Sequence, residues 1–190
     1  MSPYRPAFTE ALNLLAQACA ILRRQGVPPP ILVGGAVVEF DTAGDIHTGD
    51  LDLVTASDDE VAAALLAVGF QRETGLRHGL HGYFHPSLPV AVELVSGGYF
   101  DGLADRSRIR IVEVPGGEVL MAPTEDLIAD RASQWFASGR RDAKMLRQAQ
   151  ILLALASALD EDYLERRLRE ETMNRIGLAE LRNHHETDQP

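Results

Sequence analysis

Two aspartates, Asp50 and Asp52, stand one residue apart within the largely apolar segment 31–55. On a strand they would project from the same face with Cα atoms about 7 Å apart, while Leu51 and Leu53 would project from the other face. Two carboxylates whose charges are about 4 Å apart repel each other by about 4 kcal/mol at an effective dielectric constant of 20. A strand tolerates such a pair when it is well solvated or when it shares a divalent cation, and we predict the shared cation.

The surrounding segments predict the elements that would hold this pair. The expected strands are Ile31–Val33, Leu51–Thr55, a short one around Tyr83-Phe84, Val90–Val95, and a hairpin formed by 108–114 and 118–121. The expected helices are 8–25, 36–40, 58–68, 124–137, 141–159 and 160–170. Strands fill the first two-thirds of the chain and helices the last third, so the predicted class is α+β, a mixed β-sheet flanked by helices. We expect a core at 1–121 with an N-terminal helix, a helical element at 122–172, and a polar, flexible tail at 173–190.

The composition is that of an ordinary globular protein, with 45% apolar and 24% charged residues among 190. No segment has the pattern of a signal peptide or a membrane span, so we expect a cytoplasmic protein without membrane contact. The single cysteine, Cys19, excludes an internal disulfide and fits a reducing compartment. The net charge of −10 argues against broad electrostatic binding of nucleic acid, but it leaves room for a local patch that takes one RNA end.

Two glycines and three acids follow one another in an order that resembles a known family. Gly34-Gly35, then Asp50-x-Asp52, then Glu93 on a later strand is similar to the polymerase-β-type nucleotidyltransferases. More narrowly, the chain resembles small bacterial nucleotidyltransferase-like proteins, whose core has G-G, T-x-D-[IL]-D-[LV] and an acid on a strand. A weaker similarity lies at 122–126, where A-P-T-E-D stands in place of the family's S-P-T-x-D helix start.

This resemblance implies a reaction and a set of catalytic residues. Asp50 and Asp52 would hold two Mg²⁺ ions, and Glu93 would bind the ion beside the nucleophile and help to remove its proton. The implied reaction moves a nucleoside monophosphate from an NTP such as ATP to a hydroxyl and releases pyrophosphate.

Other residues would bind the nucleotide. Gly34 and Gly35 would let the backbone approach the triphosphate, with the following helix presenting its N–H groups, and Thr48 belongs to the same motif. Among the basic residues we select Arg131 and Lys144 for the triphosphate or the acceptor. Arg131 equally suits a structural pair with the aspartate that precedes it.

Four histidines invite a functional interpretation. Relatives often have a basic residue just before Thr-x-Asp, and here it is His47, which is largely neutral at pH 7 and helps phosphate less. His78, His81 and His85 form an H-x2-H-x3-H pattern that would suit zinc. No cysteine is near and the context is rich in glycine, so we favour a place on the acceptor side of the cleft.

The family resemblance leaves the acceptor open among a small molecule, a tRNA and a protein. It covers antibiotic-modifying enzymes and also toxins of toxin–antitoxin pairs, for which an antitoxin would be the partner. The alternative function is a catalytically silent binding or regulatory module that dimerises through its C-terminal helices. In that case the segment Arg166-Arg167-Arg169 would face a partner, although a solvated helix face is the simpler interpretation.

Overall fold

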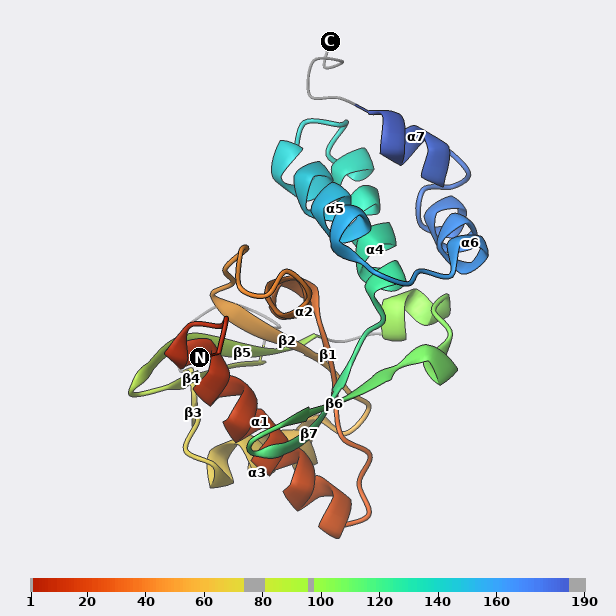
Figure 1. Cartoon of the computed structure of the whole chain (residues 1–190). Helices are drawn as coiled ribbons and strands as arrows, with labels where there is room; N and C mark the ends of the chain where they lie inside the picture. The colour runs from red at the N-terminus through yellow and green to blue at the C-terminus, as the bar shows by residue number, and fades with distance from the viewer. Residues whose placement is uncertain (1, 74–80, 96–97, 185–190) are drawn as a thin grey trace. The chain divides into compact units, whose positions relative to one another are not determined.

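The computed structural model describes residues 2–73, 81–95 and 98–184, and the chain divides into two units. The sheet unit consists of Met1–Gly98 and Ser107–Ala122, and the helical unit consists of Tyr99–Arg106 and Pro123–Pro190. Figure 1 labels their helices and strands. The predicted α+β class with a mixed sheet is confirmed.

A seven-stranded sheet with the order β3-β4-β5-β2-β1-β7-β6 forms the first unit. Its strands are β1 (Ile31–Val33), β2 (Asp50–Val54), β3 (Gln71–Arg72), β4 (His81–His85), β5 (Leu88–Val95), β6 (Arg110–Val114) and β7 (Gly117–Met121). Strand β2 lies at the centre of this order, antiparallel to β1 and parallel to β5. The strand with the two aspartates is therefore held by hydrogen bonds on both edges.

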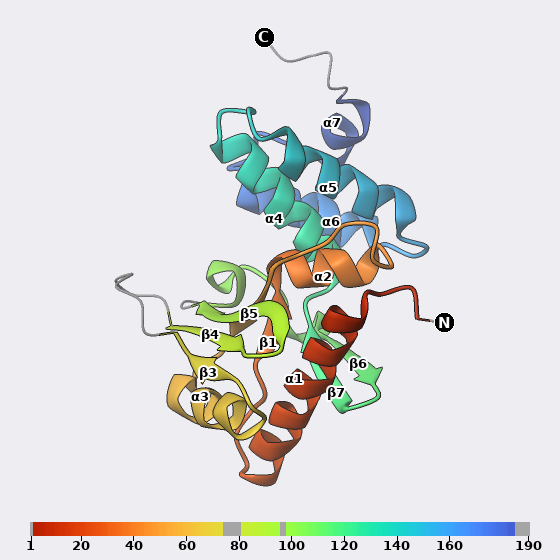
Figure 2. The ribbon, with the colours of Figure 1, turned by 90° about the vertical axis from the view of Figure 1, so that its left-hand side faces the viewer.

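Among its described residues, the sheet unit has the helices α1 (Pro6–Arg24), α2 (Gly34–Asp41) and α3 (Asp58–Ala67). Helix α1 begins with proline, whose fixed φ suits a first turn, and it ends before Gly26, which has a φ of +75°. Its apolar stripe is buried against α3, β5 and the β6–β7 hairpin. Figure 2 shows α1 running alongside that hairpin. Helix α2 packs against β1 and β2, next to the aspartates.

Cys19 lies on the buried stripe of α1, and burial raises the pKa of its thiol to about 11. At pH 8 only about one thiol in a thousand would then be the reactive thiolate. We therefore expect no measurable reaction with a disulfide reagent such as DTNB in the native protein. One equivalent should react after unfolding in guanidinium, and rapid reaction of the native protein would contradict the packing described for α1.

The helical unit contains α4 (Thr124–Ala137), α5 (Ala143–Leu155), α6 (Glu161–Glu171) and α7 (Leu178–Asn183). Two short 3-10 turns, η1 (Tyr99–Gly102) and η2 (Arg106–Arg108), lie in the segment between β5 and β6. Helix α4 packs against both α5 and α6. Asp142 and Asp160 cap α5 and α6, because each side chain accepts a hydrogen bond from a first-turn N–H. No helix within the described ranges is long and apolar enough to cross a membrane.

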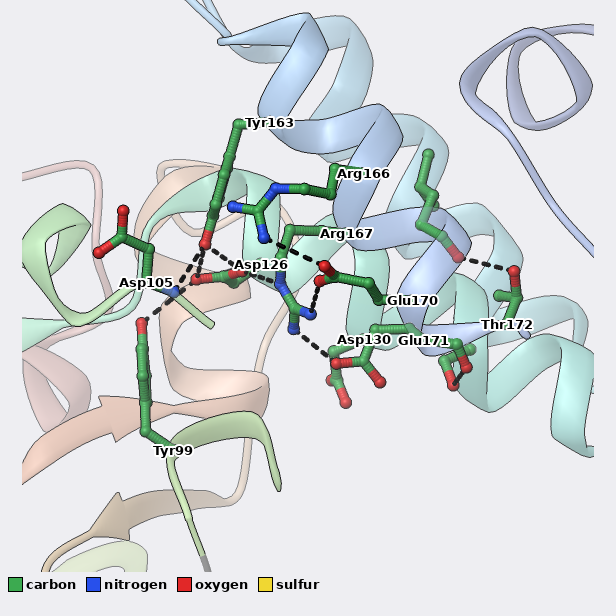
Figure 3. A network of polar contacts seen from close by, with 12 residues as sticks. Tyr99, Asp105, Asp126, Asp130, Tyr163, Arg166, Arg167, Glu170, Glu171 and Thr172 are labelled. Atoms are coloured by element: carbon green, nitrogen blue, oxygen red, sulfur yellow. Dashed lines mark hydrogen bonds and ion pairs between the residues drawn. The ribbon is translucent and has the colours of Figure 1, made fainter. Parts of the chain in front are cut away.

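Two C-terminal expectations differ from the structure. The stretch from 173 onward, expected to be a flexible tail, includes α7, which buries Leu178 and Leu181. Arg167, expected to face a partner or solvent, is fully buried and binds Asp126 in the first turn of α4. Figure 3 shows this arginine within a network of carboxylates and tyrosines. Arg167 therefore stabilises the helical unit through buried contacts, while Arg166 and Arg169 are exposed, as expected for a solvated helix face.

Candidate active site

The three predicted catalytic acids lie together on neighbouring strands. In the parallel pair formed by β2 and β5, Asp52 stands opposite Glu93 and Asp50 stands opposite Ala91. Paired residues of adjacent strands lie about 4.8 Å apart and project to the same side of the sheet. Asp52 and Glu93 are thus neighbours across the strands, and Asp50 lies two residues before Asp52 on the same face.

Burial along the two strands agrees with this arrangement. Leu51, Leu53 and Val92 are fully inaccessible, while the acids that alternate with them are half-buried. The leucines and valine therefore belong to the core, and the acid-bearing face of β2 and β5 reaches solvent. A substrate could approach the carboxylates from that side.

The glycine pair at the start of α2 lies against Asp52 and Thr48. Gly34 has a φ of +67°, and a Cβ built on it would lie 2.0 Å from Oδ2 and 2.9 Å from Cγ of Asp52. A Cβ on Gly35 would lie 2.5 Å from Oγ1 of Thr48. Neighbouring atoms of the site therefore leave no room for a side chain at either position. At Gly34 the left-handed backbone conformation is a second reason for glycine. The backbone at Gly34 thus lies close to the Asp52 carboxylate, and its approach to a triphosphate stays a prediction.

Thr48 links the glycine turn to the first aspartate. Its Oγ1 lies 3.1 Å from Oδ1 of Asp50 and 3.2 Å from the backbone oxygen of the same residue. The hydroxyl has one proton to donate, so it alternates between these two acceptors. One polar side chain thus contacts both the glycine turn and a predicted catalytic carboxylate.

The site suits Mg²⁺ in its donor atoms, because magnesium takes oxygen ligands and keeps several waters. Carboxylates of Asp50, Asp52 and Glu93 share one face, and Gly34 leaves the space beside Asp52 clear of a side chain. Within the described ranges, however, no three His, Cys, Asp or Glu side chains are grouped closely enough to hold a metal ion. The carboxylate oxygens are the type of ligand that Mg²⁺ prefers, but these side chains do not form a preassembled metal site.

Comparisons with known proteins give the fold. The sequence matches no protein-family model and no curated protein. Among solved structures, it resembles an antigenic nucleotidyltransferase-like protein from Paracoccidioides brasiliensis, with a TM-score of 0.60 and 18% identity over 90% of each chain. It also resembles the antibiotic-resistance factor ANT(2'')-Ia, with a TM-score of 0.56 and 14% identity over 85% of this chain and 91% of the other. The chain has a nucleotidyltransferase fold.

The two basic residues selected for the triphosphate belong to the helical unit of this nucleotidyltransferase fold. Arg131 on α4 is buried, and its Nη1 lies 3.1 Å from Oδ2 of Asp130. Lys144 is exposed in the first turn of α5. Arg131 thus makes the structural pair with its neighbour, and the nucleotide-binding role of both residues stays a prediction.

Two of the four histidines singled out in the sequence, His47 and His85, have side chains within the described residues. His78 lies outside the described residues, as does the side chain of His81. The ring of His85 packs edge-on against Phe70, and its Nδ1 lies 3.1 Å from Oγ of Ser87. His47 is exposed in the loop before β2. These contacts give His85 a local structural role at the end of β4.

Sequence reasoning missed Glu39 on α2. This glutamate is fully buried and binds Arg5, with Nε–Oε1 at 2.8 Å and Nη2–Oε2 at 3.1 Å. Its Oε2 also accepts a hydrogen bond of 2.7 Å from the backbone N–H of Thr48. The only signal in the sequence is a charged residue in an apolar helical stretch, Ala36 to Phe40. Its charged partner, Arg5, lies 34 residues away in the chain.

Proposed function

We propose that the chain is a nucleotidyltransferase that uses Asp50, Asp52 and Glu93 as catalytic residues. The observation that supports this most directly is the register of β2 and β5, which sets Asp52 beside Glu93 on one accessible face. The absence of a Cβ at Gly34 leaves its backbone close beside the Asp52 carboxylate. The nucleotidyltransferase fold of the solved structures supports the same class of chemistry.

In the proposed reaction, a hydroxyl oxygen of the acceptor forms a bond to the α-phosphorus of an NTP as the bond to the bridging oxygen breaks. Pyrophosphate leaves. Glu93 takes the proton from the attacking hydroxyl, and the first N–H groups of α2, next to Gly34-Gly35, face the phosphates. Asp50, Asp52 and Glu93 would hold Mg²⁺, which when bound neutralises charge on the phosphate oxygens.

Among acceptors we favour a small hydroxylated molecule. The net charge of −10 disfavours a long polyanion, and one structural neighbour is an antibiotic-resistance factor. A tRNA or protein acceptor would instead support the toxin class, with an antitoxin as partner. We place the reaction in the cytoplasm, where NTP and Mg²⁺ are available.

The test is transfer of label from α-labelled NTPs, in Mg²⁺, to parallel pools of hydroxylated antibiotics, tRNA and protein. We expect transfer by the wild type, and none above background by Asp52→Asn, which removes a charged metal ligand. In a Mn²⁺ titration with nucleotide present, this variant should bind at least tenfold more weakly, a difference of about 1.4 kcal/mol.

Asp59→Asn is the matched control, because it makes the same acid-to-amide change at an exposed position in the first turn of α3. It should transfer label and bind Mn²⁺ like the wild type. Absence of NTP binding by calorimetry, together with no transfer to any pool, would count decisively against the enzyme.

A catalytically silent module is the second candidate function. It is favoured by one specific observation, that no group of three metal-ligating side chains is assembled among the described residues. Such a module would bind Mn²⁺ weakly, with no gain from added nucleotide and no difference between the wild type and Asp52→Asn. A homodimer in solution, measured by light scattering, would fit this function.

A further inference from the structure

A buried acid, Glu39, is connected to the candidate site through Thr48. Glu39 is fully buried on α2, and an isolated carboxylate there would cost several kcal/mol. Three donors satisfy it: two guanidinium nitrogens of Arg5 and the backbone N–H of Thr48. The carboxylate is thus paired with a guanidinium and a backbone N–H, which come from two other segments of the chain.

The same two side chains hold Thr48 at both ends of its backbone. Glu39 accepts from its N–H at 2.7 Å, and Nη2 of Arg5 donates to its carbonyl oxygen. The peptide groups on both sides of Thr48 are therefore fixed to one ion pair. Because Glu39 belongs to the helix that starts at Gly34-Gly35, this clamp also sets Thr48 relative to the glycine turn.

The side chain of Thr48 contacts the candidate site. Its Oγ1 lies 3.1 Å from the Asp50 carboxylate and also against Gly35, where a Cβ would stand only 2.5 Å away. A hydroxyl oxygen held in this way stays within hydrogen-bond distance of one carboxylate oxygen of Asp50, to which it can donate. This restricts the rotation of that carboxylate.

We propose that Arg5, Glu39 and Thr48 form a positioning relay that fixes the side-chain rotamer of Asp50 beside the glycine turn. The inference rests on the proposed function, since the purpose of a fixed Asp50 is to hold a divalent cation next to Asp52. None of the three residues needs to touch the substrate. They are positioning residues, and the buried ion pair is their anchor.

The test compares Thr48→Val, which has nearly the same shape without the hydroxyl, with Thr48→Ser, which keeps the hydroxyl; the backbone clamp is retained in both. The first measurement is the set of three-bond NMR couplings to Cγ of Asp50, which report its χ1 rotamer, in protein without metal. We expect a single rotamer in the wild type and in Thr48→Ser, and averaged couplings in Thr48→Val. Glu39→Gln should average them as well, because it weakens the anchor.

The second measurement is the dissociation constant of Mn²⁺ alone. We expect Thr48→Val to bind about tenfold more weakly than the wild type and Thr48→Ser to bind within about twofold, where tenfold is about 1.4 kcal/mol. Thr55→Val is the matched control, because it removes a hydroxyl just after β2 that contacts only the backbone of Ser57 in the described interactions. It should leave the Asp50 couplings and Mn²⁺ affinity unchanged.

Unchanged Asp50 couplings in Thr48→Val would overturn the relay, whatever the metal measurement shows. A wild type that binds neither Mn²⁺ nor NTP, but in which Thr48→Val averages the Asp50 rotamer, would support the relay and overturn the proposed transferase. The two proposals therefore fail separately.

Discussion

Replacing Arg167 with methionine is expected to lower the free energy of unfolding of the helical unit by about 3–5 kcal/mol, because it leaves buried carboxylates without their counter-charge. The guanidinium is fully buried and binds Oδ1 of Asp126 at 2.7 Å, Oε2 of Glu170 at 2.9 Å and Oε1 of Glu171 at 2.5 Å. Tyr163 also donates to Asp126, at 2.9 Å (Figure 3). Methionine fills much of the space of the arginine stem and donates no hydrogen bond.

The loss of stability should increase with pH. Burial raises the pKa of Asp126 and of Glu171 even though hydrogen bonds from Arg167 lower both. A carboxyl with a higher pKa in the folded state stabilises the fold fully below its unfolded pKa, and this contribution is lost as pH rises through the folded pKa. Without Arg167 both folded-state pKa values rise further. The difference between wild type and variant should therefore widen from about pH 4 to about pH 8.

Trp135, the only tryptophan of the chain, is buried on α4 and reports unfolding of this unit by fluorescence in denaturant titrations. Arg169→Met is the matched control, because Arg169 is 45% exposed and pairs with Glu165, which is 40% exposed and takes no part in the Arg167 network. This control should lower the free energy of unfolding by less than about 1 kcal/mol at every pH. Equal costs for the two arginines would show that the buried network contributes no more than a surface pair.

The spacing of apolar residues in α6 indicates that Arg167 is buried, although its charge and its arginine neighbours suggest an exposed position. The buried face of α6 comprises Tyr163, Leu164, Arg167 and Leu168, the spacing of a helical stripe, so Arg167 occupies an apolar-stripe position between solvent-facing arginines. Recognising it as buried requires knowing that Asp126, 41 residues earlier, supplies the counter-charge. No local pattern gives that pairing.

The candidate site shows the same division between local and long-range information. The spacing of Asp50 and Asp52 predicts their shared face, because side chains alternate along a strand. The position of Glu93 beside them depends on the register of β2 and β5. A shift of one residue in that register would place Glu93 on the opposite face of the sheet from the two aspartates. In the sequence, the apolar residues Val92 and Leu94 on either side of Glu93 indicate that the acid projects from the opposite face of the strand. Arg5 and Glu39 are 34 residues apart, and no local sequence pattern indicates that they form an ion pair.

Gly34→Ala is expected to lower nucleotide-dependent Mn²⁺ affinity and label transfer by roughly 100-fold, equivalent to about 2.8 kcal/mol. The new Cβ would stand 2.0 Å from Oδ2 and 3.2 Å from Cβ of Asp52, so either the carboxylate turns away or the start of α2 moves. Both movements separate the backbone N–H groups from the carboxylates that would share the metal–nucleotide complex. The unfolding free energy should also fall by about 1–3 kcal/mol, because alanine is strained at a φ of +67°.

Variants of two other glycines distinguish the effect of the steric clash with Asp52 from the effect of backbone strain. Gly26 has a φ of +75° with open space around its Cβ position, so Gly26→Ala should lower stability and leave Mn²⁺ and nucleotide binding intact. Gly49 adjoins Asp50 with no atom within 4 Å of a Cβ and without a left-handed φ, so Gly49→Ala should change neither property. If Gly34→Ala lost only the stability that Gly26→Ala loses and bound Mn²⁺ and nucleotide normally, the approach of the glycine turn to Asp52 would have no part in binding. A loss of binding confined to Gly34→Ala would instead show that the missing Cβ serves the carboxylate beside it.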